Sequence, residues 1–140
     1  MKFNLQVTEI THDELASVFC IGCEGQDFGF AYNKNDYAKI PEGKREGDCL
    51  EDKVADCLLN GYKIAVTDYY AEGEVYGKNL EHEIDDDGAV TYYVGLQDFL
   101  NGFSNKDAME YTKDLADEND DYWTAYNLIQ FVIFGELIYA

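Results

Sequence analysis

The stretch WTAYNLIQFVIFGELIY, residues 123–139, is the most apolar part of the 140-residue chain and decides its fold. At helical spacing its apolar side chains cover most of the circumference, and a helix that is apolar nearly all round is normally buried. The run falls short of the roughly 20 apolar residues that cross a bilayer. Asp120 and Asp121 precede it, where carboxylates accept hydrogen bonds from the first N–H groups of a helix. We therefore predict a long C-terminal core helix.

Composition predicts a single folded domain over residues 1–140, because 46% apolar and 15% aromatic residues are typical of a globule with one core. The 29 acidic and ten basic residues give a net charge of −19, which repels phosphate groups. We therefore expect no direct binding to nucleic acid or membrane, and instead a partner protein with a basic surface. The N-terminal residues show no signal-peptide pattern, so we expect a cytoplasmic protein with reduced cysteines.

Capping residues indicate where helices begin and end. Thr11 and Glu14 have the spacing of a capping box, and Asp48 with Glu51 repeats that pattern. Gly61 is free to adopt the left-handed conformation that ends a helix. Together with apolar periodicity, these signals predict helices before the C-terminal one at residues 11–20, 48–60, 96–103 and 105–116.

Alternating apolar residues predict strands, at Lys2–Glu9, Phe28–Tyr32, Tyr62–Tyr70 and Ala89–Val94. The chain between the last two, Ala71–Gly88, forms either a long hairpin or an irregular acidic lobe. Helices and strands are mixed without regular βαβ alternation. The predicted fold class is therefore α+β, with a small, mainly antiparallel sheet and helices packed on one of its faces.

Negative charge is concentrated between Asp68 and Asp121, a region that holds sixteen Asp or Glu residues and three lysines. We define Glu72–Asp87 as the acidic segment. Its carboxylates recur at every second position at Glu81, Glu83, Asp85 and Asp87. In an extended chain they would share one face at intervals of about 6.6–6.8 Å, and the intervening residues Leu80, His82 and Ile84 would point into the body.

A second row, the acidic stripe, follows helical spacing at Glu110, Asp114, Asp117, Glu118 and Asp121. Rows of like charge destabilise a fold, but they suit a surface that replaces a phosphate backbone in a basic groove. We therefore predict a non-enzymatic acidic binding protein. Nucleic-acid mimicry is the specific hypothesis for its function, and the opposing interpretation is a solvated face that maintains solubility. The candidate partner-binding residues are Glu72, Glu74, Glu81, Glu83, Asp85, Asp87, Glu110, Asp114, Asp117 and Asp121.

Two alternatives depend on other side chains. Twelve tyrosines suggest an accessory protein that acts through a tyrosine-rich interface, formed by outward-facing members of the set Tyr69, Tyr70, Tyr76, Tyr92 and Tyr93. Cys20 and Cys23 have the C-x2-C spacing of a metal site, but no second pair follows, so we expect small buried cysteines. Of the two histidines, we expect His12 to face solvent and His82 to lie at the surface. No catalytic residue, metal or cofactor is predicted.

Three stretches carry a resemblance to known sequences: Glu9–Leu15 (EITHDEL), Gly47–Gly61 (GDCLEDKVADCLLNG) and Phe134–Tyr139 (FGELIY). Together they resemble an uncharacterised family of small acidic proteins from phages and conjugative elements of gut bacteria. The resemblance implies a mobile-element setting, in which small acidic inhibitors of host defence occur. It implies no activity and no functional residue.

Overall fold

The apolar C-terminal stretch forms α6 (Tyr122–Ile133) in the computed structural model, which describes residues 6–24 and 27–139. The helix ends earlier than predicted because Gly135 adopts a φ of +77° and its N–H donates to the Phe131 carbonyl, 3.2 Å away. The prediction was also wrong for two apolar side chains, since Trp123 and Leu137 are exposed. The remainder of α6 is a core helix, as predicted.

The chain beyond α6 folds back on it through one buried side chain. Gln130 is fully buried, and its Oε1 accepts hydrogen bonds from the backbone N–H groups of Ile138 and Tyr139 at 2.8 and 2.7 Å. Its Nε2 donates to the Tyr139 carbonyl at 3.2 Å. A buried amide with all these partners satisfies the backbone of the tail, so a polar residue in an apolar helix determines where the chain end lies.

Four strands form one antiparallel sheet in the order β1-β2-β4-β3. Phe30, Val66, Tyr92 and His82 are register partners across the sheet, and the first three are buried. The strand bounds are β1 Phe28–Ala31, β2 Ile64–Asp68, β3 Glu81–Ile84 and β4 Val90–Val94. The predicted α+β class is therefore confirmed, and Ala71–Gly88 contributes the edge strand β3.

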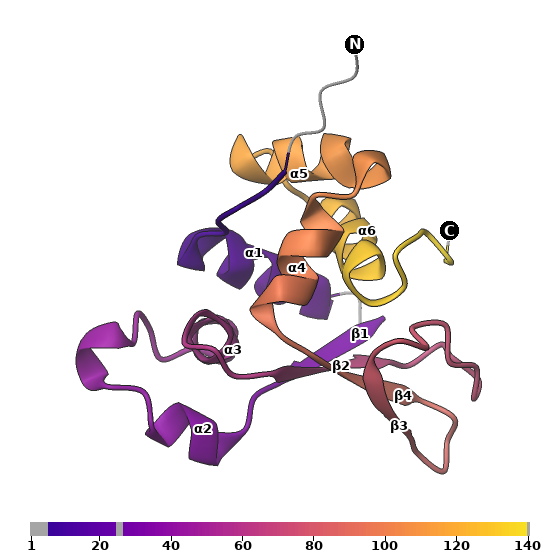
Figure 1. Cartoon of the computed structure of the whole chain (residues 1–140), viewed down its shortest axis with the longest axis horizontal. Helices are drawn as coiled ribbons and strands as arrows, with labels where there is room; N and C mark the ends of the chain where they lie inside the picture. The colour runs from indigo at the N-terminus through magenta and orange to yellow at the C-terminus, as the bar shows by residue number, and fades with distance from the viewer. Residues whose placement is uncertain (1–5, 25–26, 140) are drawn as a thin grey trace.

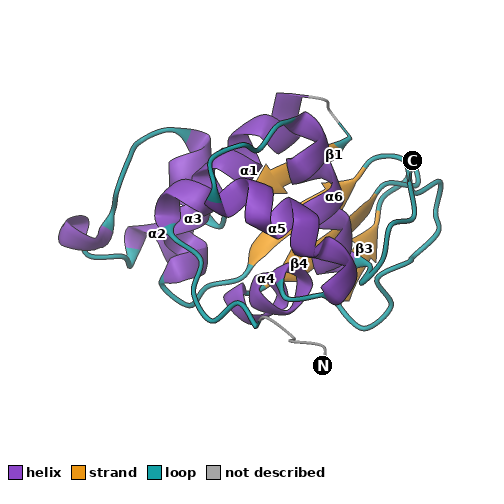
Figure 2. Cartoon of the chain, turned by 90° about the horizontal axis from the view of Figure 1, so that it is seen from above, coloured by secondary structure: helices purple, strands orange, loops and turns teal. Residues whose placement is uncertain are grey.

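Helices cover one face of this sheet, as predicted. Figure 1 shows α1, α4 and α6 above the strands and α5 above α6, and Figure 2 shows these helices lying over the strands from above. Gly102 of α4 lies so close to the backbone of Val132 in α6 that a Cβ there would approach its N and Cα within 3 Å. The remaining bounds are α1 His12–Glu24, α2 Lys34–Ala38, η1 Glu42–Lys44, α3 Leu50–Leu59, α4 Leu96–Phe103, η2 Lys106–Ala108 and α5 Met109–Ala116.

The predicted first strand, Lys2–Glu9, is not formed where it is described. Residues 2–5 lie outside the described residues, and 6–9 have no strand partner. The Val7 N–H instead donates to the Ser104 hydroxyl at 2.7 Å, so this segment bonds to a side chain near the end of α4. Alternation in the sequence thus reflects partial burial of Val7 rather than sheet pairing.

The predicted helix starts have mixed outcomes. The capping box of α1 is confirmed, since the Glu14 N–H donates to the Thr11 hydroxyl and the Thr11 N–H donates to the Glu14 carboxylate. The predicted Asp48 cap is wrong, because Cys49 occupies that position and α3 begins at Leu50, which is exposed. No helix within the described residues is long and apolar enough to span a membrane.

Candidate functional site

The acidic segment lies at the free edge of the sheet. All four residues of β3 are exposed, as are Glu72 and Glu74 in the loop before it. Glu81 and Glu83 pair with Tyr93 and Thr91, so both carboxylates lie on the face of the sheet opposite the core row. This part of the sequence prediction, a shared outward face for Glu81 and Glu83, agrees with the register.

The intervening side chains do not enter the body as predicted. His82 and Ile84 pair with the buried Tyr92 and Val90, yet both are exposed, and Ile84 retains 51% of its accessible surface. These two side chains lie on the helix-covered face of the sheet. Because β3 is the outermost strand, they nevertheless remain exposed to solvent. Only Leu80, just before the strand, packs against the core.

The alternation of carboxylates stops at the turn after β3. Asp85 accepts hydrogen bonds from the backbone N–H groups of Asp87 and Ala89 at 2.9 and 3.0 Å, so its carboxylate stabilises the turn. Gly88 has a φ of +85°, and its carbonyl accepts a 2.8 Å hydrogen bond from the N–H of Gly73. The turn and the loop that carries Glu72 and Glu74 are thereby held together.

The acidic stripe is divided between a helix and a connection. Glu110 and Asp114 lie on α5, but Asp117 ends that helix and Glu118 has a positive φ of 58°. Asp121 caps α6 by accepting a 3.0 Å hydrogen bond from the Thr124 N–H. This bond holds the pKa of Asp121 below its usual value. The stripe therefore does not continue along one helical face.

The two predicted groups of carboxylates lie on different sides of the molecule. Figure 1 shows α5 at the top of the view and β3 at the bottom, at the edge of the sheet. A single flat basic groove could therefore contact one group at a time. Among the described residues, no member of either group forms an ion pair. The basic residues that form ion pairs there are His12 and Lys39, and their partners belong to neither group.

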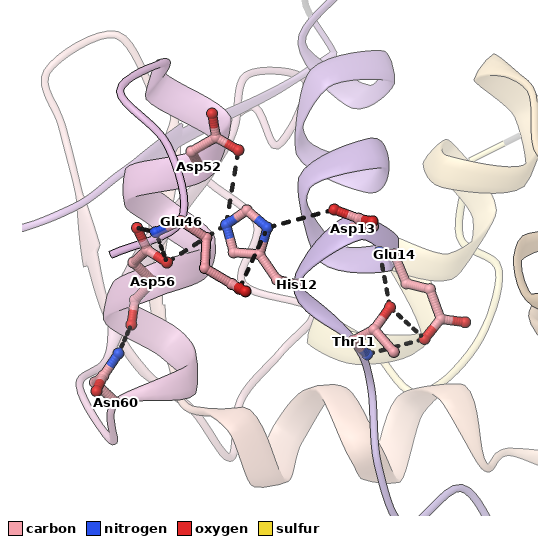
Figure 3. A network of polar contacts seen from close by, with 8 residues as sticks. All are labelled: Thr11, His12, Asp13, Glu14, Glu46, Asp52, Asp56 and Asn60. Carbon is pink, nitrogen blue, oxygen red and sulfur yellow. Dashed lines mark hydrogen bonds and ion pairs between the residues drawn. The ribbon is translucent and has the colours of Figure 1, made fainter. Parts of the chain in front are cut away.

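A separate group of carboxylates surrounds a buried histidine, contrary to the prediction that His12 faces solvent. His12 is the first residue of α1 and retains 9% of its accessible surface. Its Nε2 lies 3.4 Å from Asp56 Oδ1 and 3.6 Å from Asp52 Oδ1, both on α3. Its Nδ1 lies 3.7 Å from carboxylate oxygens of Glu46 and Asp13 (Figure 3).

Burial gives this group unusual electrostatics. Asp56 is 1% exposed, and burial raises the pKa of its carboxyl group, although the Glu46 N–H and the neighbouring His12 act in the opposite direction. The Glu46 N–H donates to both Asp56 oxygens at 3.1 and 3.3 Å. Nε2 of His12 is fully enclosed and has no hydrogen-bond partner in the part of the chain that the structure describes. We call His12, Glu46, Asp52 and Asp56 the buried cluster.

The sequence contained a partial signal for this cluster. Asp52 and Asp56 are four residues apart and therefore share a face of α3, and Asp56 lies between the buried residues Ala55 and Cys57. A carboxylate inside an apolar stretch is unusual. Its partner, His12, is distant in the chain, and only the packing of α1 on α3 brings the two together.

The cysteines differ from the expectation that they are small buried residues. Cys57 is buried, and burial raises the pKa of its thiol to about 11, so it stays protonated near neutral pH. Cys20 is exposed, which contradicts the prediction for it, and Cys49 is exposed as well. Cys23 is on α1, but its side chain lies outside the described residues, so the prediction that it is buried and the alternative of a C-x2-C metal site both stay untested.

A further buried carboxylate closes the sheet near the chain end. Asp68 is fully buried at the end of β2 and accepts hydrogen bonds from the Tyr139 hydroxyl at 2.7 Å and the Tyr70 N–H at 3.0 Å. Burial raises the pKa of Asp68 despite these bonds. Both bonds join the tail and the loop after β2 to the sheet.

Comparisons with protein-family models, curated proteins and solved structures find no match for the chain.

Proposed function

We propose that the chain is a non-enzymatic acidic binding protein whose acidic segment occupies the basic groove of a nucleic-acid-binding protein. One observation carries this proposal. The segment's carboxylates at Glu72, Glu74, Glu81, Glu83 and Asp87 are exposed and, within the described residues, form no ion pair with a basic side chain. Exposed like charges repel one another on the free protein, and a basic partner relieves that repulsion.

The edge position of β3 supports this role. Glu81 and Glu83 project from the same face of β3, with a spacing of about 6.6–6.8 Å along the strand. The turn that Asp85 stabilises places Asp87 at the tip of the hairpin. Backbone hydrogen bonds tie the loop of Glu72 to this turn. The charges are thus displayed on an ordered backbone, which lowers the entropy lost on binding. The mobile-element setting implied by the sequence resemblance makes a host defence protein the proposed class of partner.

The test compares two variants with the same loss of charge. The segment variant carries Glu81→Gln, Glu83→Gln and Asp87→Asn, and it retains Asp85 because that carboxylate stabilises the turn. The control carries Glu110→Gln, Asp114→Asn and Asp117→Asn on the other side of the molecule. Each protein is immobilised and exposed to a lysate of gut bacteria, and bound proteins are eluted with double-stranded DNA.

The proposal expects the unmodified protein and the control to capture a basic protein that DNA displaces, and the segment variant to lose it. Equal capture by the segment variant would refute the proposal. Loss from the control alone would place the interface on the acidic stripe instead.

A second candidate, an accessory protein acting through a tyrosine-rich interface, is favoured by exposed tyrosines within and just before the acidic segment. Tyr69, Tyr70 and Tyr76 retain 55, 58 and 40% of their accessible surface, whereas Tyr92 is fully buried. Tyr70 and Tyr76 both contact the ring of Tyr139, at centroid distances of 6.4 and 6.0 Å. A partner bound through these rings would resist elution by salt, because apolar contact is not screened by ions.

A further inference from the structure

The buried cluster is costly to the fold as it stands. A carboxylate inside a protein normally needs a cation or several hydrogen-bond donors. Within the described residues, Asp56 has only the Glu46 N–H and the nearby imidazole of His12. The imidazole in turn has an enclosed Nε2 that forms no hydrogen bond with any described residue, although Asp56 Oδ1 lies 3.4 Å away. Three carboxylates besides Asp56 lie within 4 Å of the same ring (Figure 3).

We propose that this cluster is a zinc site in which His12 and the carboxylates of Glu46 and Asp56 are ligands. One ligand atom from each of these three residues lies within 4.8 Å of the other two. Two ligands of a tetrahedral zinc ion, with bonds of about 2.0–2.2 Å, are about 3.3–3.6 Å apart. The distance of 3.4 Å between Nε2 and Asp56 Oδ1 matches this spacing.

The surroundings also match what a metal-bound imidazole requires. When Nε2 binds the ion, Nδ1 carries the proton, and a carboxylate usually accepts its hydrogen bond. Carboxylate oxygens of Asp13 and Glu46 both lie 3.7 Å from Nδ1, so Asp13 is available for this contact when Glu46 binds the ion. Asp52, 3.6 Å from Nε2, adds a fourth carboxylate at the edge of the site.

The donor set selects the kind of metal. An imidazole nitrogen is a poor ligand for magnesium and calcium, which prefer an all-oxygen shell, whereas zinc accepts mixed nitrogen and oxygen ligands. Three protein ligands leave one tetrahedral position for water or an external group. The side chain of Glu46 is 58% exposed, so the ion enters from the side of this residue.

The experiment measures zinc binding by calorimetry, on the full chain stripped with a chelator and held at physiological salt. The unmodified protein should bind one zinc ion at the cluster, with magnesium failing to compete at millimolar concentration. Glu46→Gln should weaken zinc binding at least about tenfold, as loss of a metal contact does. The side chain of Glu46 is exposed, and the substitution keeps the backbone N–H that donates a hydrogen bond to Asp56. The fold should therefore be preserved.

His12→Gln and Asp56→Asn extend the test, with circular dichroism as the check on folding. Glu110→Gln serves as the matched control, because it removes one exposed carboxylate that is not part of the cluster. The proposal expects the control to bind as the unmodified protein does. Equal zinc affinity in Glu46→Gln, equal losses in the control, or absence of stoichiometric binding would each overturn it and leave only diffuse attraction to an acidic surface.

Discussion

Carboxylates occur in two opposite surroundings in this molecule. Those of the acidic segment are exposed to solvent at the edge of the sheet. Among them, Asp85 stabilises the turn by accepting a backbone hydrogen bond. Those of the buried cluster converge on one imidazole between α1 and α3, and Asp56 is almost completely enclosed. The net charge of −19 therefore combines carboxylates that play different roles. Burial decides whether a given carboxylate affects stability or is free to contact a partner.

The largest effect is expected from removing the histidine of the buried cluster. His12→Ala leaves the enclosed Asp56 without the imidazole 3.4 Å away, and breaking such a buried pair costs about 3 kcal/mol of unfolding free energy. Urea denaturation in chelator-treated buffer measures the change. Glu83→Gln in the acidic segment should leave the unfolding midpoint unchanged. If both substitutions have the same effect, burial is not what separates the two regions.

A smaller effect tests whether backbone geometry, rather than charge, positions the acidic segment. Gly88 has a φ of +85°, and a Cβ there would lie 3.1 Å from the Gly73 nitrogen. Gly88→Ala should therefore reduce the unfolding free energy by about 1–2 kcal/mol. Thermal unfolding followed by circular dichroism measures it. Gly43, which has open space around its Cβ position and no positive φ, provides the control Gly43→Ala.

A pH titration of Asp68→Asn extends the comparison to another buried carboxylate. Because burial raises the pKa of Asp68 in the folded state, the unfolded chain loses its proton first as pH rises above 3.8. The wild-type protein thus loses stability between that pH and the folded-state pKa. The stability of the variant relative to the wild type should rise over this window and then stay level. A difference that is constant from pH 3.5 to 7 would contradict the assigned burial effect.

The smallest effect is expected from comparing an exposed and a buried cysteine of the same helix, α3. Cys49 is exposed at the start of α3, whereas Cys57 is buried with a thiol pKa raised to about 11. Brief treatment of the folded protein with iodoacetamide at pH 8, followed by peptide mass analysis, should modify Cys49 and spare Cys57. Denaturation before treatment should expose both. Equal modification of the two cysteines in the folded protein would show that α3 opens readily.

The sequence predicted the elements with strong local signals and missed those determined by packing. The capping box of α1 and the strand pattern of Val90–Val94 are local, and both are present. The end of α6 depended on Gly135, whose positive φ outweighs the apolar residues after it. Val7 alternates with polar neighbours but bonds to Ser104, 97 residues away.

The candidate sites show the same limit. Exposure of Glu81 and Glu83 could be predicted, because alternation places both on one strand face. The separation of the acidic stripe from the acidic segment could not, since it depends on how α5 stacks above α6. The buried cluster was missed because His12 begins a helix, a position that is usually solvent-exposed. Its burial results from contact between α1 and α3, for which the sequence carries no direct signal.

The salt dependence of binding tests most directly whether the exposed charges of the acidic segment bind a basic partner. The dissociation constant of the captured partner is measured at several salt concentrations for the unmodified protein, the segment variant and the control variant. Each released counterion adds to the slope of affinity against salt. The account predicts a shallower slope and weaker binding for the segment variant alone. Identical slopes for all three proteins would contradict it.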